Sequence, residues 1–438
     1  MKYTPLLLTI LTALSASALE FPGARVVSVA PEAASGLEGI YVLENTAGVR
    51  AVYHTSAPSA VKWYRFSNLG GAYAEEIASA AGEGGSYITL GSGDFGYIIE
   101  ADGRQHCFWV TDYSGHEFRA TALTVDPEQD CDRLRLDFEG SAAEIACYTI
   151  NGRRMAISRD ITVEHNTLAF DQESFTYTQA TATENIEYID GTSVAVAAPL
   201  CATVYTLEGD RFLRAWGRAQ QVSTATVQPT AVSAETRAVQ DTRENENEQK
   251  EPGNEGLGGS APVDITFDAV VTDAAIFHEW QISRMPEFDI NELTYTDLSF
   301  TFSFREQGRT YVRFVAADAA GVCEYVSPVY EVFVGESKLE IPNAFSPESS
   351  PGVNDEWKVS YKSLVSYECH IFNRWGQQLF ESTDPAQGWD GRHGGRFVPA
   401  GVYYYVITAT GADGVEYKRA GDINIVGYST GNRGTTEE

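Results

Sequence analysis

The chain of 438 residues carries 61 acidic and 31 basic side chains, which give it a formal net charge of -30. This balance argues against a nucleic-acid-binding protein, because such proteins need clustered Lys and Arg. We interpret the acidity as an aid to solubility or as repulsion from other anionic surfaces. The length allows three or four domains of ~100 to 150 residues each. Aromatic and β-branched residues are frequent and long helical apolar patterns are scarce, which predicts an all-β fold of tandem modules.

Residues 1–18 have the layout of a secretory signal peptide. Lys2 precedes an apolar run from Leu6 to Leu14, and Ala16-Ser17-Ala18 supplies the small residues of a cleavage site. That run is too short for a permanent membrane span, and no later stretch approaches the ~20 apolar residues that a spanning helix needs. We therefore expect an exported chain without a transmembrane segment after cleavage.

Residues 26–116 read as a first β module. Trp63 stands in a mid-domain strand, and Gly96-Tyr97 is followed by a hairpin signal at Asp102-Gly103. This order is typical of an immunoglobulin-like sandwich with Trp63 in the core and Tyr97 near a corner. An exposed aromatic platform for a ligand is the less favoured alternative.

Residues 128–226 form a second predicted β module, with a turn at Asn151-Gly152 and alternating residues from Ile161 to Phe170. The sequence around Ser193 superficially resembles the serine motif of subtilisin-like proteases. Position 197 is Ala instead of the expected proline, and no His-Gly-Thr segment supplies a base. A serine without a base is not an activated nucleophile, so no catalytic residue is assigned.

Six cysteines are spread along the chain. We expect a disulfide between Cys131 and Cys201, which flank the second module and would stabilise it by roughly 4 kcal/mol. Buried thiols are the alternative.

The seven histidines show no zinc pattern. The acidic stretch Asp126, Glu128, Asp130 and Asp132 is either a surface calcium site or, as we favour, a solvated turn. No other cofactor or metal is predicted.

Residues 227–261 change abruptly in composition, with TRENENEQKEPGNEGLGGS at their centre. Charged, Asn, Gln, Gly and Pro residues without aromatics cannot bury enough apolar area, which predicts a flexible acidic linker. Residues 262–335 then form a third module with Trp280 as the expected core residue. The spacing of Phe304, Gly308 and Tyr311 to Phe314 resembles polycystic-kidney-disease-like and related immunoglobulin-like repeats, which implies a spacer or adhesive unit by analogy of fold.

Residues 338–428 read as a small antiparallel β domain. Apolar and polar residues alternate from Tyr367 to Phe372, and the reversal Asn373-Arg374-Trp375-Gly376 then predicts a hairpin. A second run of β-formers, from Val402 to Thr408, leads to a hairpin signal at Asp413-Gly414. The remaining residues, 429–438, look like an unstructured tail.

This segment carries the spaced motifs PNAFSP, VNDEW, IFNRWG, GWDG, PAGVYYYVI, DG and GDINI. Together they resemble the type B C-terminal sorting domain of the type IX secretion system, or gliding-motility-associated C-terminal domain, of Bacteroidota. The matching motif positions are Asn343, Phe345, Pro347, Asn354, Asp355, Phe372, Asn373, Trp375, Gly376, Trp389, Asp390, Gly391, Gly401, Tyr403, Gly421 and Asp422.

The resemblance implies a signal that carries a folded passenger across the outer membrane of a Gram-negative bacterium, with the type IX secretion machinery as its partner. The protein would then be secreted or held at the cell surface. The family's Asn-Gly-Asp-Gly loop is replaced here by residues 348–352, Glu-Ser-Ser-Pro-Gly, which argues against cation binding in that loop.

The leading interpretation is a non-enzymatic protein of tandem immunoglobulin-like β-sandwich modules, ending in a sorting domain, with an adhesive or structural passenger. One alternative is a secreted hydrolase whose carboxylate pair converges only in the fold. Another is a binding module that takes surface glycans or protein ligands on exposed aromatic side chains.

Overall fold

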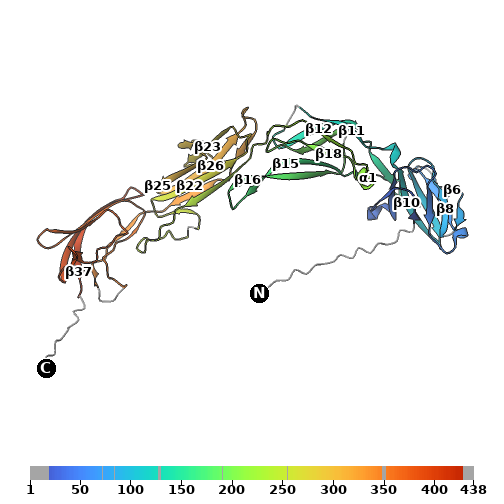
Figure 1. Cartoon of the computed structure of the whole chain (residues 1–438). Helices are drawn as coiled ribbons and strands as arrows, with labels where there is room; N and C mark the ends of the chain where they lie inside the picture. Colours follow the sequence, from blue (N-terminus) through green and yellow to red (C-terminus); the bar gives the residue numbers. More distant parts are fainter. Residues whose placement is uncertain are drawn as a thin grey trace, which may run out of the picture. The chain divides into compact units, whose positions relative to one another are not determined.

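The computed structural model describes residues 19–71, 73–82, 84–126, 130–189, 191–253, 255–347 and 352–427 (Figure 1). Within these ranges the chain is built of β-strands with one short α-helix, which confirms the all-β prediction. Two units are present, residues 1–169 with 179–230 and residues 170–178 with 231–438. No helix in the described ranges is long and apolar enough to cross a membrane. The predicted signal peptide and tail lie outside the described residues.

The first module of the first unit consists of two sheets. The strand orders are β1-β4-β8-β7 and β2-β3-β10-β9-β5-β6, and β3 runs parallel to β10. The elements are β1 (Leu19–Glu20), β2 (Val26–Val29), η1 (Ala33–Ser35), β3 (Gly39–Leu43), β4 (Arg50–Tyr53), η2 (Pro58–Ala60), β5 (Lys62–Phe66), β6 (Glu75–Ile77), β7 (Ala80–Gly82), β8 (Gly85–Thr89), β9 (Phe95–Ala101), β10 (Arg104–Asp112) and η3 (Tyr113–Gly115).

Trp63 occupies the centre of this module, as predicted. It is fully buried, and its indole N–H donates to the hydroxyl of Ser86 at 3.0 Å. Tyr97 is also buried. The predicted hairpin joins β9 to β10, with positive φ angles at both Asp102 and Gly103, as two-residue hairpin turns require.

The second module has a three-stranded sheet β11-β12-β17, a pair β13-β14, and a sheet β16-β15-β18-β19. The predicted turn at Asn151-Gly152 joins β13 to β14. The elements are β11 (Arg119–Val125), β12 (Arg133–Ser141), β13 (Ile145–Tyr148), β14 (Arg154–Ile157), β15 (Ile161–Asp171), β16 (Thr176–Ile186), β17 (Ser193–Ala197), β18 (Thr206–Glu208), α1 (Arg211–Ala215) and β19 (Gln221–Ser223).

The two modules share apolar packing. Strand β3 is buried at all five of its residues, because its side chains alternate between two cores. Tyr41 and Leu43 face the core of the first module, whereas Ile40 and Val42 belong to the cluster that fills the second. A strand covered on both faces reads as a continuous apolar run, as Ile40 to Leu43 does.

The predicted disulfide between Cys131 and Cys201 is wrong. Cys201 is a buried thiol and not half of a disulfide. Flanking one module in sequence does not bring two Cα atoms within the ~7 Å that a disulfide requires. Burial of a small apolar side chain was the alternative, and it holds for Cys201.

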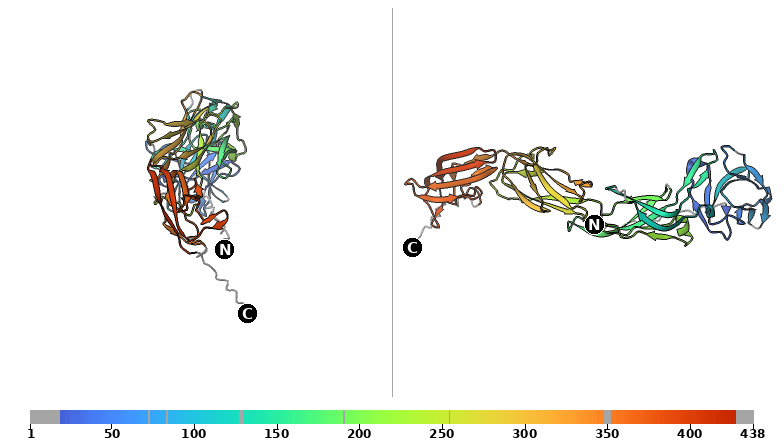
Figure 2. Two further views of the ribbon diagram at one scale, coloured as in Figure 1. Left: turned by 90° about the vertical axis from the view of Figure 1, so that its left-hand side faces the viewer. Right: turned by 90° about the horizontal axis from the view of Figure 1, so that it is seen from above.

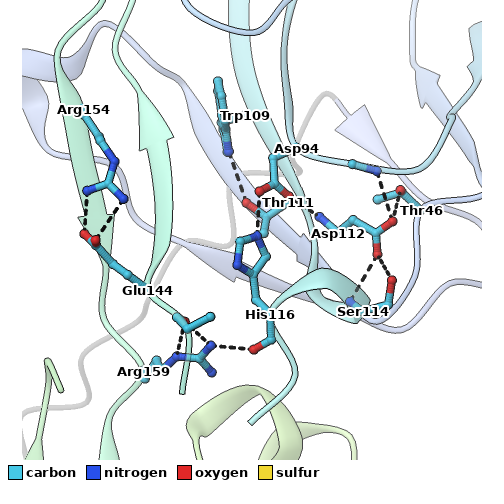
Figure 3. Close-up of polar contacts among 12 residues, drawn as sticks. Thr46, Asp94, Trp109, Thr111, Asp112, Ser114, His116, Glu144, Arg154 and Arg159 are labelled. Carbon is cyan, nitrogen blue, oxygen red and sulfur yellow. Dashed lines mark hydrogen bonds and ion pairs between the residues drawn. The ribbon is translucent and has the colours of Figure 1, made fainter. Parts of the chain in front are cut away.

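A buried ion pair stands where the two modules of the first unit meet. Arg159 and Asp210 form an ion pair with side chains 4% and 0% exposed. The hydroxyl of Tyr113 donates to Asp210 at 2.9 Å, and Asp210 also caps α1 by accepting from the Leu213 N–H at 3.0 Å. Arg159 additionally donates to the backbone carbonyl of His116 at 2.5 Å (Figure 3). Each charge therefore has the partners that its burial demands.

We expect Arg159→Met to lower the free energy of unfolding of this unit by about 3–5 kcal/mol, because it leaves Asp210 buried without a counter-charge. Chemical denaturation of a chain of residues 19–438 measures the change. Arg154→Met is the matched control: it breaks an ion pair with Glu144 in which both side chains are about half exposed, so a loss of only ~0.2–1 kcal/mol is expected. Equal losses in the two variants would contradict this account.

In the second unit, the third module is a sandwich of two sheets, β20-β22-β25 and β21-β28-β26-β23-β24, with β27 paired to β26. Trp280 is fully buried between them, as predicted. The strands are β20 (Ala234–Gln240), β21 (Leu257–Gly259), β22 (Val263–Val271), β23 (Phe277–Ser283), β24 (Leu293–Tyr295), β25 (Ser299–Phe304), β26 (Gly308–Ala317), β27 (Glu324–Val326) and β28 (Tyr330–Val334).

The predicted flexible linker, residues 227–261, is largely ordered. Strand β20 pairs along its length with β22, and β21 pairs with β28. Between them, residues 243–251, which we call the strap, lie against the following domain. The Gln249 N–H donates to the Tyr361 carbonyl at 2.7 Å, and the Tyr361 N–H donates to the Asn247 carbonyl at 3.0 Å. Composition misled the prediction because the strap is held by hydrogen bonds and not by apolar area.

Asn247 is the central polar contact of the strap. Its side-chain amide donates to the backbone carbonyls of Val359 and Pro385, each at 2.8 Å. Nearby, Lys362 and Glu251 form an ion pair at 2.8 Å with both side chains mostly buried. The strap is therefore fixed by its side chains as well as by its backbone.

We expect Asn247→Ala to reduce stability by about 1–3 kcal/mol, because two carbonyls lose their donor in a partly buried site. Hydrogen exchange should accelerate at the Tyr361 and Gln249 amides. Asn291→Ala serves as the control, since Asn291 is exposed and its side chain has no hydrogen bond to a described residue. Unchanged exchange in Asn247→Ala would show that the strap is held by other contacts.

Candidate export signal

The last domain is built on a five-stranded sheet of order β30-β37-β36-β32-β33, whose strands are seen side by side at the red end of the chain (Figure 2). Two small ladders, β29-β31 and β34-β35, complete it. The strands are β29 (Lys338–Glu340), β30 (Ala344–Phe345), β31 (Ser360–Lys362), β32 (Leu364–Phe372), β33 (Gln378–Ser382), β34 (Arg392–His393), β35 (Arg396–Phe397), β36 (Gly401–Gly411) and β37 (Glu416–Ile425).

Three of the aromatic motif residues meet in the core. The ring of Trp389 lies 5.6 Å from that of Phe345 and 5.4 Å from that of Tyr403, centre to centre. The Trp389 indole N–H donates to the Arg392 carbonyl at 3.0 Å. The Tyr403 hydroxyl donates to the Pro399 carbonyl at 2.6 Å. Phe345 and Tyr403, which are more than 50 positions apart in the sequence, thus pack against the same tryptophan. The two ring pairs have the tilted and edge-to-face geometries that aromatic side chains favour.

Trp357, from the VNDEW motif, belongs to the same core although we did not single it out from the sequence. Its backbone exchanges two hydrogen bonds with that of Trp389, at 2.8 and 3.0 Å, and its indole N–H donates to the Pro342 carbonyl at 2.7 Å. Its place after a polar loop and before the alternation of residues 359–361 was the available signal.

The reversal predicted at Asn373-Gly376 is confirmed, and it carries one exposed aromatic ring. The Asn373 side chain accepts from the backbone N–H groups of Trp375 and Gln377, each at 3.0 Å. Gly376 has a φ of 82°, which favours glycine. The Trp375 side chain is 76% exposed, and the Arg374 guanidinium lies 4.3 Å from its ring centre.

The other motif residues set turns and strand ends. Asn343 accepts from the Asn424 N–H at 2.9 Å, which continues the pairing of β30 with β37. Gly391 has a φ of 76°, and a side chain there would press on Pro347 and Phe345.

Three further motif residues accept hydrogen bonds from the backbone of nearby residues. The Asn354 carbonyl accepts from the Ser346 N–H. The carboxylates of Asp355 and Asp390 accept from the backbone N–H groups of Gly352 and Arg392, respectively. On the sheet, Phe372 ends β32, Gly401 begins β36, and Gly421 and Asp422 lie in β37.

A polar network missed from the sequence joins the start of this domain to its last hairpin. The Ser337 hydroxyl and N–H donate to the Asp413 carboxylate at 2.7 and 2.9 Å, and the same hydroxyl lies 2.8 Å from that of Tyr417. Burial tends to raise the pKa of Asp413, but hydrogen bonds from Ser337 outweigh it and hold that pKa below its ordinary value. The predicted hairpin signal Asp413-Gly414 is therefore also a tether.

The two candidate cation loops are only partly described. Glu128 of the acidic turn and residues 348–351 of the loop after the FSP sequence lie outside the described residues. Across the ranges given above, no group of three or more His, Cys, Asp or Glu side chains is placed to hold a metal ion. Cys369, in the core of this domain, is a buried thiol whose burial raises its pKa to about 11.

Comparison with known proteins assigns this domain. The family model of the CHU_C type IX secretion signal domain matches residues 339–425. This segment is a type IX secretion signal domain. The match confirms the resemblance drawn from the spaced motifs. A type IX signal implies export to the medium or the cell surface and interaction with the type IX secretion machinery.

The second module is a fibronectin type III domain, matched over residues 123–224. No curated protein matches the chain.

Solved structures with partial similarity to this chain include the following three. A tetra-tandem repeat from the extending region of a large adhesion protein is 13% identical, with coverage of 87% of this chain and 96% of that one and a TM-score of 0.21. Three N-terminal domains of the bacteriophage RB49 highly immunogenic outer capsid protein are 8% identical, with 70% and 99% coverage and a TM-score of 0.23. The BSP domain of a biofilm-associated protein is 8% identical, with 93% and 96% coverage and a TM-score of 0.17.

The two motif tryptophans should respond differently to truncation. We expect Trp389→Ala to destabilise the signal domain by about 3–5 kcal/mol, because it empties the centre of the core. Trp375→Ala is the matched control and should change stability by no more than ~0.5 kcal/mol, as is usual for an exposed side chain. Denaturant titration followed by tryptophan fluorescence and circular dichroism measures both. A large loss in the Trp375 variant would mean that the hairpin tip supports the fold.

Proposed function

We propose that the chain is a non-enzymatic adhesive or structural protein, which the type IX secretion system carries across the outer membrane and which is then released or held at the cell surface. The carrying observation is the signal domain at residues 339–425, in which the motif aromatics Phe345, Trp389 and Tyr403 pack in one core. The signal is therefore presented as a folded surface together with its passenger.

The build of the passenger supports a structural role. The polar side chains of the passenger that most resemble a catalytic arrangement instead bond strands and modules to one another. Ser193 donates to Asp137 and accepts from Arg135 at 2.9 Å, contacts that join β17 to β12. Arg159 and Asp210 neutralise each other at the buried junction of the first two modules. Immunoglobulin-like modules commonly act as spacers or adhesive units, an argument that rests on fold analogy.

Deletion of residues 338–438 in the producing cell tests the export part. The shortened protein should accumulate in the periplasm and fall to background in the medium and on the surface, measured by immunoblotting of fractions and by surface proteolysis. Arg154→Met in the full chain is the matched control and should be exported normally, because it alters one exposed ion pair.

A fusion supplies the reciprocal test. A periplasmic reporter joined to residues 231–438, which include the strap, should reach the surface or the medium. A fusion with residues 338–438 alone lacks the strap contacts to Val359 and Tyr361 and should be exported less well. Retention of the longer fusion in the periplasm, or unchanged export of the deleted chain, would contradict the proposal.

A further inference from the structure

One sheet of the third module ends in an edge strand that lacks the usual protection against pairing with another strand. Strand β25 lies at the end of the order β20-β22-β25, and β22 is its partner there. Its sequence, Ser-Phe-Thr-Phe-Ser-Phe, has no charge and no proline over six residues. Proteins normally protect such edges with charges, prolines or very short strands. The opposite edge, β20, carries Glu235 and Arg237.

The backbone of β25 offers hydrogen-bonding groups at regular intervals. The Ala269 N–H donates to the Leu298 carbonyl at 2.8 Å, in register with the pair Asp268 and Ser299. Backbone groups of successive residues point to opposite sides of a strand. The even-numbered residues of β25 therefore bond to β22, and Ser299, Thr301 and Ser303 direct their N–H and C=O groups away from it.

The apolar face of β25 is partly open. Phe304 is buried, whereas Phe300 and Phe302 are half-buried. Phe300 stacks on Tyr295 with ring centres 4.3 Å apart, and Phe302 meets Phe304 edge to face at 4.8 Å. These rings are held in place before any partner arrives, so little side-chain entropy is lost when their open sides are covered.

Opposite charges flank the uncharged strand. Asp297 lies two residues before β25 and Arg305 directly after it, and both are exposed. Neither side chain forms an ion pair or a hydrogen bond with another residue of the described part of the chain. Their spacing of four residues on either side of Thr301 is symmetrical.

We propose that β25 pairs antiparallel with β25 of a second copy of this chain, with Thr301 opposite Thr301. In this register Ser299 faces Ser303, Phe300 faces Phe302, and Asp297 faces Arg305 twice across the two-fold axis. The outward-directed backbone groups of Ser299, Thr301 and Ser303 then bond to each other. The two three-stranded sheets join into one continuous six-stranded sheet, in the self-complementary manner of two-fold dimers.

The flanking charges select this register. A shift by two residues keeps the backbone groups in phase but places Asp297 opposite Ser303 or Arg305 opposite Ser299, and the charge pairing is lost. A shift by one residue would turn the phenylalanines of one copy to the polar face. The proposed register alone satisfies backbone, rings and charges together.

The dimer should be weak and reversible, because a single strand pair buries less than the ~1,200 Å² of a standard interface. It rests on the edge of the third module and not on the export role, so purified mature chain is the appropriate sample. Sedimentation velocity over a wide range of concentrations should show a monomer that converts to a dimer.

Charge reversal tests the register. Asp297→Arg and Arg305→Asp should each weaken self-association by at least about tenfold, because two attractive cross-strand pairs become repulsive. An equimolar mixture of the two variants should associate again, since every Arg then faces an Asp, and the double variant should dimerise like the unaltered chain. Asp289→Arg is the matched control at an exposed site away from β25, and it should dimerise normally.

Thermal denaturation confirms that each variant is folded, and the mixture provides a gain of association that misfolding cannot imitate. A chain that stays monomeric at all concentrations would overturn the proposal. So would dimerisation that both single variants retain, or the failure of their mixture to associate.

Discussion

The free edges of β-sheets are the constraint on which this structure depends. Every edge strand leaves backbone N–H and C=O groups that need partners, and a chain of small sandwiches has many edges. In the signal domain, the edge of β31 receives the strap, whose backbone exchanges hydrogen bonds with Tyr361. Because the strap lies between β20 and β21 of the third module, the contacts that cover the edge of β31 are supplied by that module.

The cores show a second regularity, which follows from their size. Trp63, Trp280 and Trp389 are each fully buried, and each indole N–H has an acceptor: the Ser86 hydroxyl and the carbonyls of Leu298 and Arg392. A tryptophan fills much of a small core, and its N–H usually has a hydrogen-bond acceptor when it is buried. The fibronectin type III domain departs from this pattern, since its core continues into the first module and is completed by the buried Arg159–Asp210 pair.

Local patterns in the sequence were sufficient for several strands and turns and for the central tryptophans, because these depend on alternation and on residues such as Asn373 and Gly376. They were not sufficient for β20 and β21, which lie within the predicted linker. Contacts between distant segments were not predictable in the same way. The strap has a composition typical of disorder, yet Asn247 finds two carbonyls on a surface more than 100 residues later. Arg159 and Asp210 are 51 positions apart and lie in unremarked stretches of sequence. The disulfide prediction failed for the same reason, since spacing along the chain does not fix distance in space.

The signal domain was the part most readily predicted from the sequence, because its motif residues are mostly structural. Phe345, Trp389 and Tyr403 define a core, and Asn343, Asp390 and Gly391 define turns and strand ends, so a fixed pattern of residues reports a fixed shape. The passenger carries no comparable pattern, and its distinctive feature, the open edge of β25, is visible only once the neighbours of that strand are known. A weak edge contact also suits an exported chain: single copies stay apart while dilute, whereas many copies held on one surface raise the effective concentration and favour pairing without any stronger contact.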